Sequence, residues 1–428
     1  MAVTGRLGLL ALLAAPVVGL LLPGWAGIGL AAAVLLLLVV LDLLLAGSVR
    51  RLRFARSGAT SVRLGEACEV TLTVANPGGR PVRAKLRDAW PPSAGADDRH
   101  RLSLPAGERR VVTTRLLPTR RGDRRAARVT VRSVGPLGLA ARQGSHDVPW
   151  TVRVLPPFHS RKHLPSRLAR LQQLDGRNAV LIRGQGTEFD SLREYVIGDD
   201  VRSIDWRASA RASDVMVRTW RPERDRQVVL VLDTGRVSAG RVGDAPRLDA
   251  AMDAALLLAV LAARAGDRVD LFAYDRQVQA AVQGSTELLP ALVNAMAPLE
   301  PSLIETDARG MVAEVLRRTR RRALVVLLTG LDAAPLEEGL FPVLSTLTSR
   351  HQLVVASVAD PRVAEMAAGR GDAEAVYDAA AAEWVLAERR QVTARLARHG
   401  VEVVDAVPEE LPPRLADRYL ALKAAGRL

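Results

Sequence analysis

The chain has 428 residues, of which 49% are hydrophobic and 25% are charged, and its formal net charge at pH 7 is +14. This length is enough for roughly two or three domains with apolar cores. The single cysteine, Cys68, excludes an internal disulfide bond and a metal cluster built from cysteines.

Two apolar segments at the N-terminus predict a pair of transmembrane helices, at residues 7–22 and 25–45. At about 1.5 Å per residue the second is long enough to cross a bilayer, and the first is shorter. Arginines follow the second segment and none lies between the two, which predicts a cytoplasmic-membrane hairpin with both ends and the soluble domains in the cytoplasm. Asp42 is expected at the membrane interface. A cleaved signal peptide is the alternative, and the immediate second apolar run argues against it.

The positive charge is concentrated in one region. Residues 48–156 contain 22 basic and 8 acidic residues, whereas the two kinds balance from residue 157 to the end. A nucleic-acid surface usually adds stacking aromatics or a recognisable helical module. This region has only Phe54, Trp90 and Trp150. An anionic membrane surface is therefore the favoured partner of this region, with an ordinary solvated surface as the alternative.

Residues 48–156 also predict a small β-sandwich, because short runs of alternating apolar and polar residues are bounded by turn signals such as Asn76-Pro77-Gly78-Gly79. Residues 157–226 predict a linker, with one helix at 166–174, followed by a dense charged motif.

From residue 227 onward, strands and helices are predicted in alternation. The strands are expected at 228–232, 268–273, 323–328, 353–358 and 401–404, and the helices at 247–265, 287–296, 308–318, 336–349, 380–398 and 412–424. This alternation predicts an α/β, doubly wound (Rossmann-like) parallel sheet with helices on both faces. The expected domains are thus 1–47, 48–156, 157–226 and 227–428.

The most informative segment is residues 184–235. It contains Phe189, Leu192, Arg193, Tyr195, Gly198, Asp199, Asp200, Arg202, Ile204, Asp205, Trp206, Ala210 and Arg211, followed by an apolar strand ending at Asp233. This combination resembles the bacterial domain of unknown function 58 family. Upstream, Arg120-Arg121-Gly122 and Gly135-Pro136-Leu137-Gly138-Leu139 resemble a turn of that family. The resemblance covers essentially the whole chain. It implies two membrane helices, a C-terminal von Willebrand factor A-like domain and a MoxR-type AAA+ ATPase as partner.

In the von Willebrand factor A fold, the aspartate at this position begins a D-x-S-x-S metal site. Here Gly235 and Val237 replace both serines, while Thr306 and Asp332 are the candidates on the second and third loops. An ion such as Mg²⁺ prefers about six oxygen ligands near about 2.1 Å. A degenerate site of Asp233, Thr306 and Asp332 is therefore predicted, which binds metal weakly or not at all. A rearranged site with weak Mg²⁺ binding stays open, and no other cofactor is expected.

The acids of the charged motif have arginines close by in sequence, such as Arg202 after Asp199 and Asp200, and Arg207 after Asp205. Carboxylate–guanidinium pairs orient a segment and keep both groups charged, which is the wrong state for a general acid. The motif is therefore predicted to be a structural brace or a partner-docking surface rather than a catalytic site, with Trp206 as a packing anchor. Its candidate residues are Phe189, Arg193, Tyr195, Gly198, Asp199, Asp200, Arg202, Asp205, Trp206 and Arg211.

The sequence contains no G-x-x-x-x-G-K-[ST] phosphate loop and no G-x-S-x-G nucleophile motif. An enzyme is therefore not expected. The sequence predicts a non-enzymatic, membrane-anchored adaptor that binds a protein partner at the crevice of its α/β domain. A metal-dependent ligand-binding or adhesion module and an uncharacterised hydrolase are the alternatives.

Overall fold

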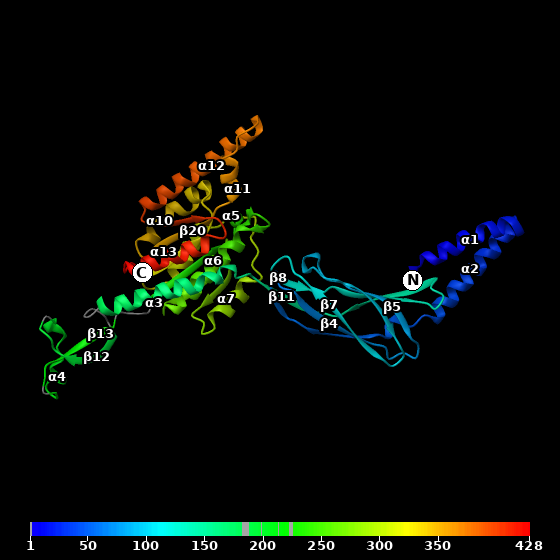
Figure 1. Ribbon diagram of the computed structural model, residues 1–428, viewed down its shortest axis with the longest axis horizontal. Coiled ribbons are helices and arrows are strands. Elements are labelled where there is room, and N and C mark those ends of the chain that lie inside the picture. Colours follow the sequence, from blue (N-terminus) through cyan, green and yellow to red (C-terminus); the bar gives the residue numbers. More distant parts are fainter. Residues whose placement is uncertain (1, 182–187, 198, 213, 222–225) are drawn as a thin grey trace. The chain divides into compact units, whose positions relative to one another are not determined.

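The computed structural model describes residues 2–181, 188–197, 199–212, 214–221 and 226–428, and its helices and strands are drawn in Figure 1. The chain divides into two compact units, Met1–Leu155 and Pro156–Leu428. Among the described residues, the first unit combines two apolar helices with β-sheets, and the second combines a six-stranded, mostly parallel sheet with helices and two separate two-stranded sheets. The protein is thus of mixed α/β class.

The apolar helices are α1 (Gly5–Leu21) and α2 (Trp25–Leu45), as the sequence predicts within two residues. Most of their side chains are exposed in the protein itself. By length and composition, one described helical segment, Trp25–Arg51, could cross a membrane. A Cβ atom at Gly27 would lie 2.2 Å from the carbonyl oxygen of Leu22. Glycine at this position therefore lets α2 begin directly against the end of α1.

The start of α1 is tied to the β-structure of the first unit. The short strand β1 (Ala2–Val3) pairs antiparallel with β10 (Ala140–Asp147). The Thr4 hydroxyl, next to α1, donates to the carbonyl oxygens of Gly138 and Leu139 over 2.5 and 3.0 Å. The first turn of α1 is therefore held on the loop of residues 135–140.

The end of α2 is held on the same loop. The Asp42 side chain is fully buried, and its carboxylate accepts hydrogen bonds from the backbone N–H groups of Leu137, Leu139 and Ala140 over 2.7, 2.8 and 2.8 Å. The sequence placed Asp42 at the membrane interface and did not indicate this contact. A charge near a helix end gives no sign of a partner that lies 95 to 98 residues later in the chain.

The rest of the first unit is β-structure, arranged in sheets with the strand orders β1-β10-β9-β5-β6, β2-β4-β7 and β3-β11-β8. A 3-10 turn at Val49–Arg51 follows α2, and a second lies at Pro92–Ala94. The strands are β2 (Arg53–Gly58), β3 (Ser61–Arg63), β4 (Cys68–Ala75), β5 (Val82–Asp88), β6 (Arg99–Leu104), β7 (Arg109–Leu116), β8 (Gly122–Arg125), β9 (Arg128–Val134), β10 and β11 (Thr151–Leu155).

Alternation along these strands separates the core from the charge. In β5, Val82, Ala84 and Leu86 are buried, whereas Arg83 and Lys85 between them are exposed. Buried side chains of β4 and β5, which lie in different sheets, belong to one apolar cluster. Successive residues of a strand point to opposite faces, so the basic residues of this strand lie on the surface while the same strand fills the core.

The second unit begins with a 3-10 turn at His159–His163 and α3 (Leu164–Leu181), a helix longer than the one predicted. The Ser160 hydroxyl donates to the Asp253 carboxylate over 2.8 Å, and the Ser160 backbone N–H also donates to it. Burial raises the pKa of Asp253, and the hydrogen bonds from Ser160 act in the opposite direction. These contacts hold the start of the unit on the helix that carries Asp253.

The main sheet has the strand order β18-β17-β14-β19-β20-β21. Every neighbouring pair is parallel except β17 with β18. The predicted parallel sheet is therefore confirmed, and the antiparallel edge strand β18 is an addition. The strands are β14 (Gln227–Asp233), β17 (Arg268–Tyr274), β18 (Val278–Gln283), β19 (Ala323–Leu328), β20 (Gln352–Val358) and β21 (Glu402–Ala406).

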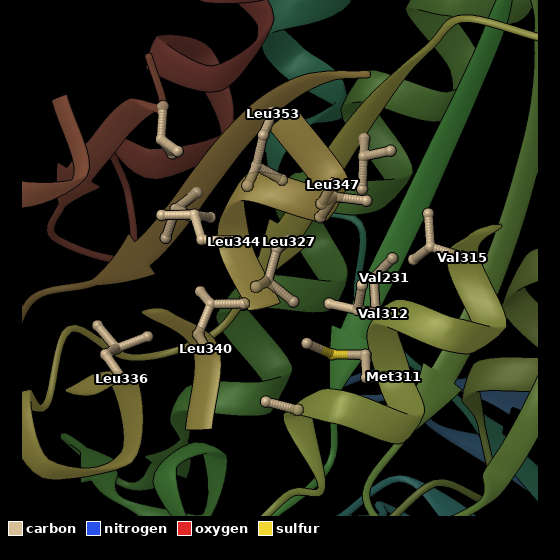
Figure 2. Close-up of a cluster of buried hydrophobic side chains, with 14 of the residues drawn as sticks. Val231, Met311, Val312, Val315, Leu327, Leu336, Leu340, Leu344, Leu347 and Leu353 are labelled. Atoms are coloured by element: carbon tan, nitrogen blue, oxygen red, sulfur yellow. The ribbon is translucent and has the colours of Figure 1, made fainter. Parts of the chain in front are cut away.

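Helices cover both faces of this sheet (Figure 1). On one face, side chains from β14 and β19 such as Val231 and Leu327 meet Met311, Val312 and Leu344 of the covering helices (Figure 2). The alternate side chains of the strands point to the other face, against which α6 packs. The helices are α5 (Arg236–Ala239), α6 (Arg247–Arg264), α7 (Leu288–Met296), α8 (Ala308–Arg318), α9 (Ala333–Pro335), a π-helical turn (Leu336–Leu340), α10 (Phe341–Thr348), α11 (Pro361–Ala367), α12 (Ala373–Arg398) and α13 (Leu411–Ala424).

Three local differences from the sequence prediction have physical reasons. The helix expected at 380–398 begins at Ala373, because the Asp372 side chain caps it by accepting from the backbone N–H of Ala375 over 2.8 Å. The edge strand β18 is mostly exposed, so its apolar alternation is weak. No strands were predicted in the charged motif, whereas β12 (Glu188–Glu194) and β13 (Met216–Arg221) form an antiparallel hairpin.

Candidate functional site

Asp233 is the last residue of β14, the strand that pairs with β17 on one side and with β19 on the other. In open α/β sheets, the crevice at the carboxyl ends of the strands forms where the chain connections diverge in this way. The Asp233 side chain is only 4% exposed there. A carboxyl group so deeply buried needs internal hydrogen-bond partners.

Two threonines and a backbone amide supply these partners. Asp233 Oδ1 accepts from the backbone N–H of Gly235 over 2.8 Å and from the Thr306 hydroxyl over 2.5 Å. Asp233 Oδ2 accepts from the Thr329 hydroxyl over 2.5 Å. Burial raises the pKa of the Asp233 carboxyl, and the hydrogen bonds from Thr306, Thr329 and Gly235 lower it to a lesser extent.

The residues around Asp233 do not fit a six-oxygen cation site. A Cβ atom at Gly235 would lie 2.0 Å from Thr306 Oγ1, so a serine there would displace the threonine. Val237 supplies a methyl group, and its Cγ1 lies 2.1 Å from where a Cβ of Gly330 would be. The converging oxygens are those of one carboxylate and two hydroxyls, and they are already bonded to one another. Gly235 and Val237 therefore supply no side-chain oxygen, and a serine at position 235 would have no space.

The structure brings Thr306 to Asp233 as predicted, but not Asp332. Asp332 instead forms an ion pair with Arg247, whose Nη1 lies 3.4 Å from Asp332 Oδ2. Thr329 contacts Asp233 instead, and no sequence motif indicated this residue. Leu328 of β19 pairs with Leu232 of β14, so Thr329 follows in register with Asp233. Register between two parallel strands is the signal that could have identified it.

The cavity beside Asp233 has a volume of about 30 Å³ and is lined by Glu305, Thr306, Thr329 and apolar side chains that include Met311 and Leu336. A cavity must exceed about 10–15 Å³ to hold one water molecule. Pockets for metabolites measure about 300–1,000 Å³. The space at Asp233 is therefore large enough for a water molecule and too small for an organic substrate.

Ion pairs lie on the loops at the carboxyl ends of the strands, and one of them includes Glu305 of the cavity lining. Arg236 lies 3.3 Å from Glu305, and the Arg362 guanidinium lies 2.8 Å from Asp360. The hydrogen bond from Arg362 lowers the pKa of Asp360. Together with Arg247 and Asp332, these pairs make a charged rim. Exposed pairs add little to stability, but such groups orient a binding partner.

The charged motif is a second candidate site, and most of it lies between β12 and β13. Its connection contains a 3-10 turn (Val201–Ser203) and α4 (Trp206–Ser209). Gly198 lies outside the described residues, and so does the side chain of Phe189, whose backbone in β12 pairs with that of Trp220. The other candidate residues, Arg193, Tyr195, Asp199, Asp200, Arg202, Asp205, Trp206 and Arg211, are all in this hairpin.

The carboxylates of the hairpin bind backbone groups as well as arginines. Asp205 Oδ1 accepts from the backbone N–H groups of Arg207 and Ala208, both over 3.0 Å, and Asp205 Oδ2 accepts from Arg218 Nε over 2.7 Å. Hydrogen bonds from Ala208 and then from Arg218 lower the pKa of Asp205. Its side chain therefore joins α4 to β13.

The arginine partners differ from those expected from sequence distance. Asp205 pairs with Arg218 rather than with Arg207, and Asp199 pairs with Arg193 over 2.6 Å. Asp200 accepts from the backbone N–H of Arg202 over 3.0 Å. The antiparallel pairing of β12 with β13 brings Arg218 to Asp205, and sequence separation alone cannot indicate that contact.

Several apolar side chains of the hairpin are exposed. Trp206 is 69% exposed, which contradicts the expectation that it is a packing anchor, and Ile197 is 96% exposed. Val196 and Val201 are exposed as well, whereas Val217 is buried. Exposed apolar residues concentrated in one small element are typical of contact surfaces.

Comparison with known proteins agrees with the motif. A family model described as "Protein of unknown function DUF58" matches residues 191–412. An uncharacterized protein of Mycobacterium bovis is 26% identical over 197 residues, which are 45% of this chain and 61% of that protein. An uncharacterized protein of Mycobacterium tuberculosis gives the same values. The chain thus spans 61% of the length of these curated relatives.

Among solved structures, the CARDB domain of a Pyrococcus furiosus protein, in complex with di-metal ions, is 21% identical. The match covers 24% of this chain and 86% of that domain, with a TM-score of 0.19, which is too low to support an argument. The family model, by contrast, matches more than half of the chain, including β13, the Asp233 strand and the sheet that follows. The chain therefore belongs to the family of proteins of unknown function DUF58.

Proposed function

We propose that this protein is a non-enzymatic, membrane-anchored adaptor. Its α/β domain is of von Willebrand factor A type, with a degenerate metal site, and it binds a protein partner at the carboxyl ends of its strands. The family resemblance suggests a MoxR-type AAA+ ATPase as that partner, acting on a client or complex.

The observation that supports this proposal most is the closed cluster at Asp233. Both carboxylate oxygens are occupied by Thr306, Thr329 and Gly235, and the adjoining cavity of about 30 Å³ is too small for a substrate. The ion pairs of the charged rim have partly exposed side chains. A surface of exposed charges around a filled centre suits contact with another protein better than catalysis.

The anchor in this proposal is a transmembrane hairpin of α1 and α2. Thr4, before α1, and Asp42, near the end of α2, both contact the loop of residues 135–140. Both hairpin ends would then lie on the side of the β-structure, which would be a β-sandwich against the cytoplasmic leaflet. Arginines directly after α2 favour this orientation, since cytoplasmic loops are rich in Lys and Arg.

The test is an affinity purification with full-length protein in mild detergent, with and without EDTA, followed by mass spectrometry. We expect an AAA+ ATPase in both samples. Reversing a rim charge with Arg236→Glu should reduce its recovery, whereas Arg320→Glu should not, because Arg320 is an exposed residue before the amino end of β19.

Other outcomes would change the proposal in defined ways. One such outcome is loss of the ATPase from the EDTA sample. If its own need for metal does not explain that loss, the result would favour a metal-dependent ligand-binding module. Absence of any ATPase would remove the proposed partner.

A further inference from the structure

A cavity of about 380 Å³ lies in the first unit, at the end of α2. Its lining combines the end of that helix, the turn between β4 and β5, and one residue of β10. The lining residues are Leu44, Ala46, Ser48, Arg51, Asn76, Gly78, Gly79, Arg80 and Arg142. Three of these side chains are cationic and none is acidic.

The turn that forms one wall is fixed by Asn76, whose side chain is buried. Its amide donates to the carbonyl oxygens of Arg80 and Pro105 over 2.9 and 3.1 Å, and its Oδ1 accepts from the backbone N–H of Gly78 over 3.1 Å. A Cβ atom at Gly79 would meet no atom within 4 Å. This wall of the cavity is therefore a backbone turn that the Asn76 hydrogen bonds fix in place, with free space next to Gly79.

Two of the arginines are positioned by the end of α2. Arg142 Nε donates to the carbonyl oxygen of Leu43 over 2.9 Å, and Arg80 donates to the carbonyl oxygen of Leu44. The last carbonyl groups of a helix have no partner within the helix, so the guanidinium groups cap it. Each guanidinium retains further N–H groups for another acceptor.

The charge of this cavity is uncompensated. Among the described residues, neither Arg51, Arg80 nor Arg142 lies within ion-pair distance of a carboxylate. Guanidinium groups bind phosphate oxygens with two parallel hydrogen bonds, and backbone N–H groups of a glycine turn can add to such a site. An anion with several oxygens is the ligand that this arrangement fits.

We propose that this cavity binds a phosphate group, either the headgroup phosphate of an anionic phospholipid or free phosphate. The lipid source rests on the proposed membrane insertion of α2, because the cavity lies at the C-terminal end of the segment Trp25–Arg51 and would then be at the depth of the headgroups. A lipid bound there would fix the β-structure against the membrane by one specific contact.

The lipid source is tested by native mass spectrometry of the detergent-solubilised full chain, titrated with phosphatidylglycerol or with phosphatidylcholine. A variant with Arg51→Gln, Arg80→Gln and Arg142→Gln is compared with a matched control, Arg83→Gln, Arg101→Gln and Arg128→Gln. The control removes the same charge from exposed positions of the same unit outside the cavity.

An arginine near an anionic lipid contributes about a fivefold change in affinity. We expect the cavity variant to bind phosphatidylglycerol about a hundredfold more weakly, the control to lose less than about fivefold, and phosphatidylcholine to bind weakly throughout. Arg51→Gln alone should cost about fivefold. Arg51 makes no hydrogen bond with its side chain among the described contacts, so this variant keeps the test valid if the triple variant misfolds.

Free phosphate is tested by calorimetric titration of the same proteins without lipid. Arginine-dependent phosphate binding together with no preference for phosphatidylglycerol would assign the site to free phosphate. Equal losses in the cavity and control variants, with no arginine-dependent phosphate binding, would overturn the proposal. Alkaline carbonate extraction of the membranes separately tests the anchor, and its failure would leave the phosphate measurement valid.

Discussion

Asp42, near the end of α2, accepts a hydrogen bond over 2.8 Å from the backbone N–H of Leu139, 97 residues later in the chain. The same carboxylate binds the N–H groups of Leu137 and Ala140. A Cβ atom at Gly135 would lie 2.1 Å from Asp42 Oδ1, so only glycine lets the loop approach so closely. The Gly135-Pro136-Leu137-Gly138-Leu139 segment thus binds the Asp42 carboxylate through its backbone N–H groups.

Replacing Asp42 with asparagine should loosen this loop. The asparagine amide has one accepting oxygen, and its NH₂ group would face a backbone N–H, leaving a buried donor without a partner. We expect a loss of about 1–3 kcal/mol in local stability. Hydrogen exchange of the full chain in detergent should show faster exchange at residues 137–140.

Asp97→Asn is the control, because Asp97 is an exposed acid of the same unit with no side-chain hydrogen bond among the described contacts. Unchanged exchange at residues 137–140 in Asp42→Asn would contradict the assigned role.

Thr329 should stabilise the second unit through its bond to Asp233. Thr329→Val keeps the shape of the side chain but removes the donor to a buried carboxylate oxygen. We expect the free energy of unfolding to fall by about 1–3 kcal/mol in denaturant titrations of the full chain. Thr346→Val, at an exposed helix position, should change it by less than about 0.5 kcal/mol. Equal effects of the two substitutions would show that the Thr329 hydroxyl makes no net contribution.

The pKa of Asp233 predicts a pH dependence. Burial raises this pKa in the folded protein, so the folded state holds the proton more tightly than the unfolded state does. The stability that this adds is present below the unfolded pKa and is lost as pH rises through the folded pKa. Relative to the wild type, Asp233→Asn should therefore become more stable as pH rises from acid toward neutral, as measured by urea titrations at several pH values.

Asp360 gives the opposite control. The bond from Arg362 lowers the pKa of Asp360, so its contribution is present above the unfolded pKa and is lost as pH falls through the folded pKa. The destabilisation caused by Asp360→Asn should therefore shrink in acid. Parallel pH trends for the Asp233 and Asp360 variants would contradict the assignment of Asp233.

The hairpin should depend on the carboxylate of Asp205. Asp205→Asn weakens both the cap of α4 and the contact with Arg218, so backbone amides of residues 207–208 should exchange faster at neutral pH. Because the hydrogen bonds lower the pKa of Asp205, the wild-type hairpin should lose the same protection as pH falls through the folded pKa. Asp214→Asn, at an exposed position of the same hairpin, is the control, and an equal response there would sink the prediction.

The periodicity of the sequence predicted a large part of the fold. The parallel sheet, the helix at Ala308–Arg318 and the strand at Ala323–Leu328 were located to the residue or nearly so, because each buries a regular apolar pattern. The hairpin of β12 and β13 was missed, since its residues are mostly charged or exposed and carry no such pattern.

What the sequence determined by itself is therefore local: which segments are apolar, how they alternate, and that Gly235 and Val237 have no side-chain oxygen for a metal ion. Only the tertiary structure decided the partners of the charged groups. Thr329 reaches Asp233 through strand register, and Asp42 reaches Leu139 through a loop far along the chain. The physical reason is that a burial pattern depends on residues close together in the sequence. The hydrogen bonds of a buried carboxylate depend instead on which backbone N–H or hydroxyl group, far away in the sequence, the fold brings within about 3 Å.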